Sequence, residues 1–175
     1  MHLMTLSVRA IKKGKIIWEE LHRKNVLHPQ GKELLLSAAF FRENGPLGPL
    51  PTQWFIGLDT RSTIGRGDTL KEVVEYEPKS KDYARISIME NEGFSWLWQE
   101  SEESGNPPEF TINASAEFTP NEDWGMVNNF FLTSVQEGDK GILVCSNKLK
   151  KPRSMDEEVS FTIDCLLNLR EDTIK

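Results

Sequence analysis

The end of the chain carries the most regular alternation of apolar and polar positions. In EVSFTIDCLLNL, residues 158–169, an apolar residue recurs at every second position. The apolar set is Val159, Phe161, Ile163, Cys165, Leu167 and Leu169, and the polar set is Ser160, Thr162, Asp164 and Asn168. A period of two places the two sets on opposite faces of a strand. The segment therefore predicts a β-strand with one buried face and one wet face.

Shorter segments with strand signals precede it. They are residues 4–10, 15–21, 53–58, 83–89, 94–100, 109–118, 126–134 and 142–148. Gly14 suits a hairpin turn between the first two, and ENEG at 90–93 predicts a hairpin turn between 83–89 and 94–100. Short strands separated by turns, without regularly alternating helices, predict a mainly β fold. We expect an antiparallel β-sandwich or a jelly roll.

Two segments change to helical spacing. Pro29 suits a first helical turn, and residues 30–43 predict a helix near the end of the N-terminal third. Its apolar positions are Leu35, Leu36, Ala38, Ala39 and Phe40. A second, short candidate lies at 69–76, inside a long polar connection at 59–82. Leu70, Val73 and Val74 would dock that helix onto the core.

The length of 175 residues is that of a single domain. We expect residues 1–28 to form N-terminal strands or an arm, and residues 29–175 to form the β-sandwich, with both parts in one continuous domain. A domain of this size buries a core without help from metals or disulfides.

The charge of the chain limits its partners. A net charge of −6 opposes tight binding to nucleic acid. The basic run KLKKPR at 148–153 includes a proline and precedes MDEE, which favours a solvated turn over a phosphate-binding patch. No apolar stretch reaches the roughly 18 residues of a membrane span, and the N-terminus lacks the pattern of a signal peptide. We expect neither nucleic acid nor a membrane as a partner.

The sequence contains no recognisable catalytic or cofactor motif. GxSxG, HExxH and glycine-rich phosphate loops do not occur. Cys145 and Cys165 lie in strand patterns and are expected to be buried free thiols rather than a disulfide. The three histidines, His2, His22 and His28, are too scattered to suggest a zinc site. We expect no metal and no cofactor, and a protein that is not an enzyme; a hydrolase with two acidic residues on the sandwich is the remaining enzymatic alternative.

Three short matches add little to this picture. Arg66–Gly67–Asp68 matches the integrin-binding tripeptide, Asn113–Ser115 matches a glycosylation acceptor, and residues 121–123 offer oxygen ligands for calcium. The last set lacks the spacing of an EF-hand loop. Matches of this length are common by chance in polar segments.

The aromatic residues of FSWLWQE carry the candidate interface. Trp96 and Trp98 share one strand face with Phe94, and this face belongs either to the core or to a contact surface for a partner. Leu97 and Leu166 are apolar residues on nominally polar faces, which a neighbouring subunit would cover. The interface candidates are therefore Trp96, Trp98, Leu97 and Leu166.

The order of several short signals resembles a family of small phage virion proteins with head-decoration or tail-fibre roles. The matching positions are Asn25, Gly31, Leu34 and Leu35; Trp54 to Leu58; Tyr83, Ala84 and Arg85; and Trp124 and Gly125. The resemblance covers about residues 15 to 169. The chain departs from the family at KEVVEYEPKSK, where relatives have loops rich in Gly and Thr, and at the extended loop SEESGNPP.

The resemblance implies a non-enzymatic structural protein of the virion, made in the host cytoplasm. It implies most directly a capsid decoration protein that binds the major capsid protein or other virion proteins, with a homotrimer favoured. A tail-fibre or baseplate component that contacts the host surface is the alternative. It also implies that Gly57 permits a close approach in a core strand and that Arg85 pairs with an acidic residue in a structural role.

Overall fold

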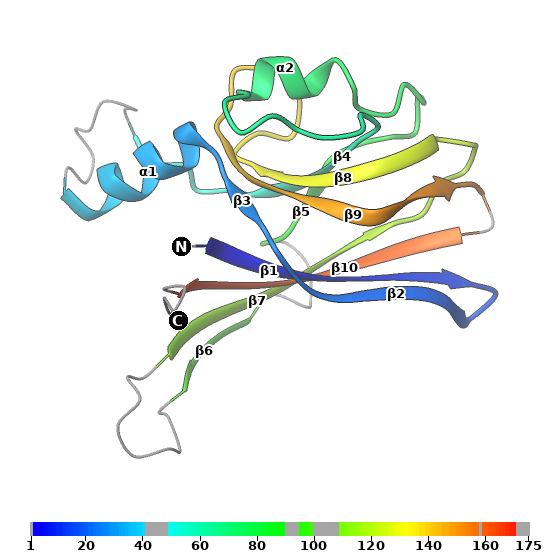
Figure 1. The fold of residues 1–175 in the computed structure, drawn as a ribbon, viewed down its shortest axis with the longest axis horizontal. Helices are drawn as coiled ribbons and strands as arrows, with labels where there is room; N and C mark the ends of the chain where they lie inside the picture. The colour runs from blue at the N-terminus through cyan, green and yellow to red at the C-terminus, as the bar shows by residue number, and fades with distance from the viewer. Residues whose placement is uncertain (1, 41–48, 90–94, 100–108, 158, 171–175) are drawn as a thin grey trace.

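The protein forms two antiparallel five-stranded sheets packed face to face (Figure 1). The computed structural model describes residues 2–40, 49–89, 95–99, 109–157 and 159–170. This architecture confirms the predicted mainly β class and the β-sandwich. The first sheet, sheet A, has the strand order β2-β1-β10-β7-β6. Its strands are β1 (His2–Lys12), β2 (Lys15–Lys24), β6 (Ser95–Gln99), β7 (Glu109–Phe118) and β10 (Val159–Arg170).

Sheet B has the order β3-β9-β8-β4-β5. Its strands are β3 (Val26–Leu27), β4 (Phe55–Asp59), β5 (Ile86–Ser87), β8 (Gly125–Thr133) and β9 (Leu143–Met155). Two helices accompany the sheets, α1 (Pro29–Phe40) and α2 (Leu70–Val74).

The N-terminal strands are integral to sheet A. β1 pairs with β10 from His2↔Arg170 to Lys12↔Val159, so it occupies the interior of the sheet and is not a free arm. The turn that joins β1 to β2 contains Gly14 with φ of +75°, as the predicted hairpin requires.

The core lies between the sheets, and β10 contributes to it as its alternation predicts. Val159, Phe161, Ile163 and Cys165 are buried, whereas Ser160, Thr162 and Asp164 are partly exposed. Sheet B supplies Ile56, Leu58, Phe130 and Leu132 from the facing side. Sheet A therefore keeps one wet face.

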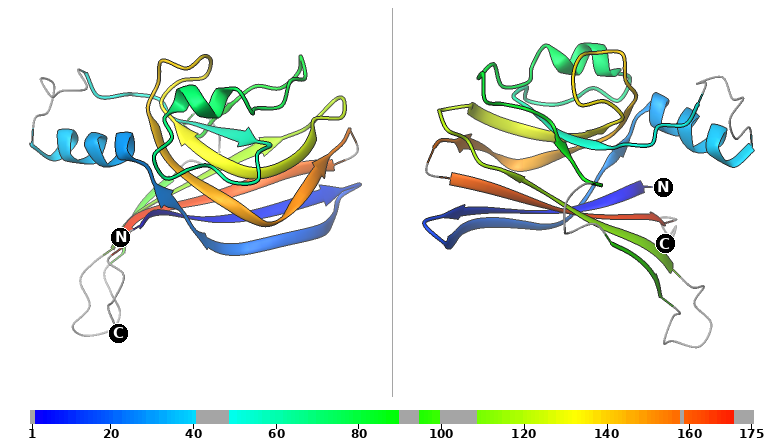
Figure 2. Two further views of the ribbon diagram at one scale, coloured as in Figure 1. Left: turned by 45° about the horizontal axis from the view of Figure 1, so that its top comes forward. Right: turned by 180° about the vertical axis from the view of Figure 1, so that it is seen from behind.

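Sheet B, in contrast, is covered on both faces. All five residues of β4 are buried, because α2 and the connection at 60–82 lie over the outer face of the sheet (Figure 2). A second apolar cluster fills this layer; its members are Ile64, Leu70, Val73, Phe131 and Leu143. The docking of α2 through Leu70, Val73 and Val74 is confirmed. The connection at 60–82 therefore forms a third layer over sheet B.

Gly57 is a point of close approach in a core strand, as the resemblance implied. In the β4–β8 pair Gly57 lies opposite Phe131, and a Cβ atom on Gly57 would lie 2.2 Å from Cζ of that ring. The Phe131 ring therefore occupies the space above the glycine. A side chain at position 57 would displace the ring.

The helix α1 begins one residue before the predicted start at residue 30, and the predicted positions 41–43 lie outside the described residues. The face that it buries differs from the expected apolar positions. Gly31, Leu34 and Ser37 face the sandwich, whereas Leu36 and Phe40 are exposed. The reason is the close approach of α1 to β9, where a Cβ atom on Gly31 would lie 2.2 Å from the carbonyl oxygen of Val144. Because the two backbones approach so closely, the face of α1 that carries glycine is buried rather than the most apolar face.

The basic run at 148–153 is part of a strand, and the predicted turn was wrong. β9 continues through it to Met155, with Leu149 and Met155 buried. Lys148 pairs with Asn129 and Arg153 with Val127, so residues 149–152 of β9 lie opposite Asn128 alone. This β-bulge accommodates Pro152, because the ladder is interrupted there.

The turn predicted at 90–93 lies outside the described residues, but the strands on either side of it do not pair with each other. β5 pairs with β4 in sheet B, whereas β6 pairs with β7 in sheet A. The chain therefore passes from one sheet to the other between Ser87 and Ser95. In the described part of the chain, no helix has both the length and the apolar character needed to cross a membrane.

Candidate functional site

The layer over sheet B is organised by a buried carboxylate at the end of β4. Asp59 is fully buried, and its Oδ1 accepts hydrogen bonds from Nδ2 of Asn129 at 2.9 Å and from the backbone N–H of Arg61 at 3.0 Å. Nε of Arg61 donates to Oδ2 at 2.9 Å. Burial raises the pKa of Asp59, while Arg61 and the Asn129 hydrogen bond oppose that rise. The carboxylate is thus held by partners from within the chain.

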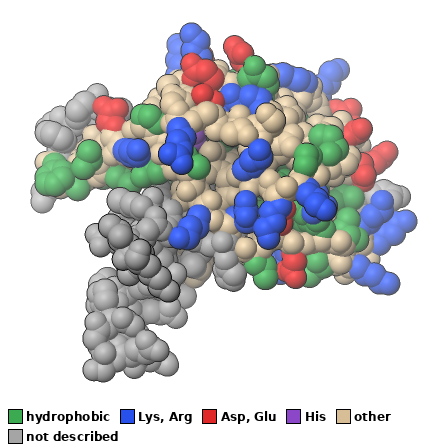
Figure 3. Space-filling view, in the orientation of Figure 1, with side chains coloured by type: hydrophobic (Ala, Val, Ile, Leu, Met, Phe, Trp, Pro, Cys, Tyr) green, Lys and Arg blue, Asp and Glu red, His purple; other side chains and the backbone are tan. Residues whose placement is uncertain are grey.

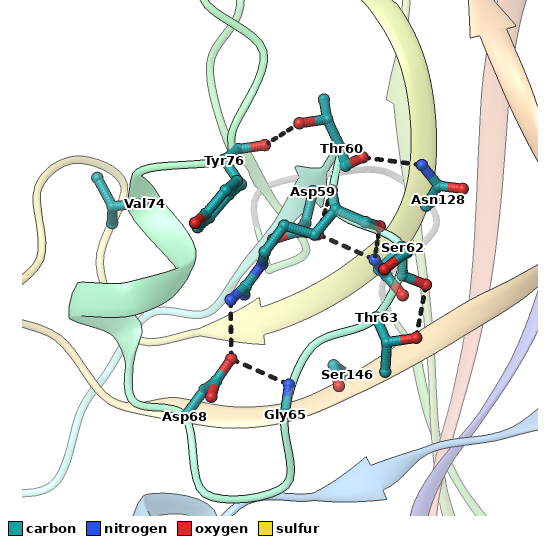
Figure 4. A network of polar contacts seen from close by, with 12 residues as sticks. Asp59, Thr60, Ser62, Thr63, Gly65, Asp68, Val74, Tyr76, Asn128 and Ser146 are labelled. Atoms are coloured by element: carbon teal, nitrogen blue, oxygen red, sulfur yellow. Dashed lines mark hydrogen bonds and ion pairs between the residues drawn. The ribbon is translucent and has the colours of Figure 1, made fainter.

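Arg61 extends this network into the connection. Its Nη1 donates to Oδ2 of Asp68 at 2.8 Å, and its guanidinium lies 4.6 Å from the centroid of the Tyr76 ring. The backbone N–H of Gly65 also donates to Asp68, at 3.0 Å (Figure 4). The Asp68 side chain is only 23% exposed. Asp68 therefore folds the tripeptide at 66–68 onto the protein, which favours a structural role over integrin binding.

A second buried network holds the far end of the connection. Nε and Nη2 of Arg85 donate to the two carboxylate oxygens of Glu77 at 2.9 and 2.8 Å. Arg85 also donates to the carbonyl oxygens of Val135 and Gly138, each at 3.0 Å. The pairing of Arg85 with an acidic residue is confirmed. Arg85 is 2% exposed and binds Glu77 through two nitrogens, so it links the connection to the turn after β8.

Tyr83 links the Arg85–Glu77 pair to β4. Its hydroxyl donates to Oε1 of Glu77 at 2.7 Å and accepts from the backbone N–H of Leu58 at 2.9 Å. Burial raises the pKa of Tyr83 well above its ordinary value, and the Glu77 carboxylate adds to the rise. The phenol therefore remains a neutral hydrogen-bonding group at physiological pH.

Trp124 forms a corner beside Tyr83. The two rings meet edge to face with centroids 5.3 Å apart, and the indole N–H donates to Oδ1 of Asp82 at 2.6 Å. Hydrogen bonds to its carboxylate, first from Ser80, lower the pKa of Asp82. Gly125 follows with φ of +80°, a left-handed conformation that favours glycine. Tyr83, Arg85, Trp124 and Gly125 thus build one structural corner.

A shallow hollow of about 550 Å³ lies outside this corner, lined by Thr60 and residues 75–80 and 122–125. It presents the carboxylates of Glu75, Glu122 and Asp123. Within the described residues, no group of three or more His, Cys, Asp or Glu side chains is arranged to hold a metal ion. The calcium alternative at 121–123 thus gains no support from the geometry.

One buried pair has the elements of a nucleophile and a base. Nε2 of His28 lies 2.8 Å from Oγ of Ser146, and burial lowers the pKa of His28. His28 is fully buried and Ser146 is 4% exposed. A substrate would have to displace the connection to reach them, which favours a structural contact between the start of α1 and β9.

The two cysteines are buried free thiols, as predicted. Burial raises the pKa of Cys145 to about 12 and that of Cys165 further. Both groups are therefore protonated and poor nucleophiles in the folded protein.

The predicted interface residues are placed by backbone only. Trp96, Leu97 and Trp98 lie in β6, and Leu166 lies in β10, while the side chains of all four lie outside the described part of the structure. The register puts Trp96 opposite Ile112 and Trp98 opposite Phe110, and it puts Leu166 opposite Asn113. β6 and β10 lie on opposite sides of β7, so the four residues come from two strands that are not neighbours in sheet A.

The sequence pattern did not reveal Asp59, Arg61 or Glu77 as organising residues. The one usable signal was an acidic residue closing an apolar strand, followed two positions later by arginine. Comparison with known proteins adds no assignment: no family model, no curated protein and no solved structure matches this chain.

Proposed function

We propose that the protein is a non-enzymatic structural component of a virion that decorates the capsid and stabilises it by binding the major capsid protein. Three features support the proposal. The chain resembles small phage virion proteins in the order of its sequence signals. Two buried ion pairs, Asp59–Arg61 and Glu77–Arg85, hold the layer that covers sheet B. Its net charge of −6 disfavours a role on nucleic acid.

The observation that carries the proposal is the outer end of α1. The helix extends beyond the two sheets, and Leu36 and Phe40 are 59% and 75% exposed (Figures 1 and 3). Ala38 and Ala39 are exposed beside them. Apolar side chains gathered on a projecting helix are typical of a surface that a partner covers. A capsid subunit with an apolar recess would bury this end and leave the rigid sandwich on the particle surface.

Reassociation with stripped particles tests this role. The variant Leu36→Glu/Phe40→Glu should lose binding to capsids from which the native protein has been removed. Met126→Glu is the matched control, because Met126 is 49% exposed on β8, away from α1. Full binding by the α1 variant would contradict the proposed surface.

Counting copies in purified particles distinguishes the two virion locations. A decoration protein is expected in hundreds of copies, and its removal should lower the heat stability of the capsid while leaving infectivity. A few copies per particle, together with lost adsorption after removal, would instead favour the tail or baseplate alternative. Absence from purified particles would refute both.

A further inference from the structure

The four edges of the two sheets differ in how they are protected. Exposed sheet edges carry unpaired backbone groups, which proteins usually shield by short strands, charges or side-chain caps. The edge strands β3 and β5 of sheet B are each two residues long. On the β2 side, Nδ2 of Asn147 donates to the carbonyl oxygen of Arg23 at 2.9 Å, and the Glu20 carboxylate accepts from the backbone N–H of Lys150. Two edges are therefore short, and at the β2 edge a side chain caps one carbonyl oxygen.

Lysines add to the shielding on the β2 side. Exposed lysines lie on β2 and on the facing part of β9: Lys15, Lys24, Lys148, Lys150 and Lys151. Figure 3 shows Lys and Arg side chains gathered over this part of the molecule. Their charge disfavours pairing with another strand.

Among the described residues, the edge at β6 shows none of these devices. β6 spans five residues, Ser-Trp-Leu-Trp-Gln, without a charge, a proline or a glycine. Among the described residues it pairs only with β7, from Ser95↔Asn113 to Gln99↔Glu109. The end of the β6–β7 pair also extends beyond sheet B in two views (Figures 1 and 2). Within the described residues no strand pairs with the other side of the β6 backbone, and an added strand would pair there.

The sequence of β6 identifies the strand that fits. SWLWQ is nearly the same in both directions around Leu97. Antiparallel pairing of two copies centred on this residue places Leu97 opposite Leu97, Trp96 opposite Trp98 and Ser95 opposite Gln99. Aromatic cross-strand pairs stabilise sheets, and this arrangement has the two-fold symmetry of the commonest homodimers.

We propose that β6 pairs with β6 of a second copy of this chain, joining the two A sheets into one continuous sheet. The pairing does not depend on the proposed role in the virion. It predicts a two-chain species, in place of the trimer that the family resemblance suggested.

Position-specific crosslinking tests the register. Leu97→Cys places two thiols opposite each other, and Cα atoms in directly opposed antiparallel pairs are about 4.5–5.5 Å apart, within disulfide range. Ser95→Cys is the matched control, because the two introduced thiols would lie about four residues, or roughly 13 Å, apart along the strand. Mild oxidation should crosslink the Leu97 variant at least tenfold more than the control. The native thiols are buried and free, so they do not compete.

Charged substitutions at position 97 test the same pairing without crosslinking. Leu97→Lys and Leu97→Glu should each shift the protein to single chains in sedimentation experiments, because like charges would face each other across the axis. An equal mixture of the two variants should restore the two-chain species. Circular dichroism of each variant verifies that the monomer is folded.

Several results would overturn the proposal. The first two are a wild-type protein that is monomeric at every concentration, and a three-chain species whose mass does not change when residue 97 is substituted. The other two are equal crosslinking of the Ser95→Cys and Leu97→Cys variants, and a mixture of Leu97→Lys and Leu97→Glu that stays monomeric. If the charged variants fail to fold, the crosslinking ratio alone decides.

Discussion

Replacing Arg85 by Met tests how the connection at 60–82 is held to sheet B. The arginine is 2% exposed and its partner Glu77 is 11% exposed. Removing the guanidinium takes away two hydrogen bonds to Glu77 and two to the carbonyl oxygens of Val135 and Gly138. The Glu77 carboxylate would then keep the Tyr83 hydroxyl but lose its counter-charge.

The magnitude follows from this geometry. Removing one partner of a buried ion pair costs about 3–5 kcal/mol of unfolding free energy. The small exposure of Glu77 admits some water, so we expect the lower part of that range, about 3–4 kcal/mol. For a chain of this size, this corresponds to a fall in Tm of roughly 6–16 °C.

Urea unfolding followed by circular dichroism measures the effect. Arg85→Met/Glu77→Leu should recover part of the loss, because no uncompensated charge stays buried. Arg66→Met is the control, since Arg66 is an exposed arginine in the same connection, and it should change stability by less than about 0.5 kcal/mol. A loss below about 1 kcal/mol for Arg85→Met, or a double variant less stable than the single, would refute the argument.

Three further predictions concern the interior. Gly57→Ala should cost about 1–3 kcal/mol, because the new methyl group would overlap the Phe131 ring, and Phe131→Leu in the same chain should relieve part of that cost in a double-mutant cycle. The pKa of His28 is below its ordinary 6.5 in the folded state, so stability should be full above that pH and fall as the pH drops toward the folded pKa. The urea midpoints measured at about pH 7.5 and about pH 5.5 should differ less in His28→Asn than in the wild type. Asp59, whose pKa is raised, contributes in the opposite direction, but its contribution is the same in both proteins. An equal change of the midpoint with pH in the two proteins would contradict this prediction. Cys145 and Cys165 should resist thiol reagents in the native protein and react in denaturant; rapid native labelling would show that the core opens.

The sequence predicted best those elements whose pattern is local. β7 has the predicted bounds, and the buried and exposed positions of β10 between Val159 and Cys165 follow their alternation. The same holds for α2, where Leu70 and Val73 are the buried positions. In each case the period of apolar residues matches the geometry of the element, so no knowledge of the neighbour is needed.

The errors arise where a distant segment decides the outcome. Pro152 suggested a turn, but a bulge opposite Asn128 absorbs it within β9. The buried face of α1 is selected by the backbone of Val144, which no periodicity reveals. The sequence did not single out Asp59 and Glu77, because only folding buries each of them against its arginine partner.

Because the connection at 60–82 covers sheet B, the two sides of the molecule should differ in their tolerance to substitution. Ile64, Leu70 and Val73 belong to the interior although they lie in a stretch with the composition of a spacer. A saturation mutagenesis map should therefore show intolerance in the middle of that stretch. An epitope inserted for display belongs instead at the exposed Lys13–Gly14 hairpin, where the backbone already turns in solvent.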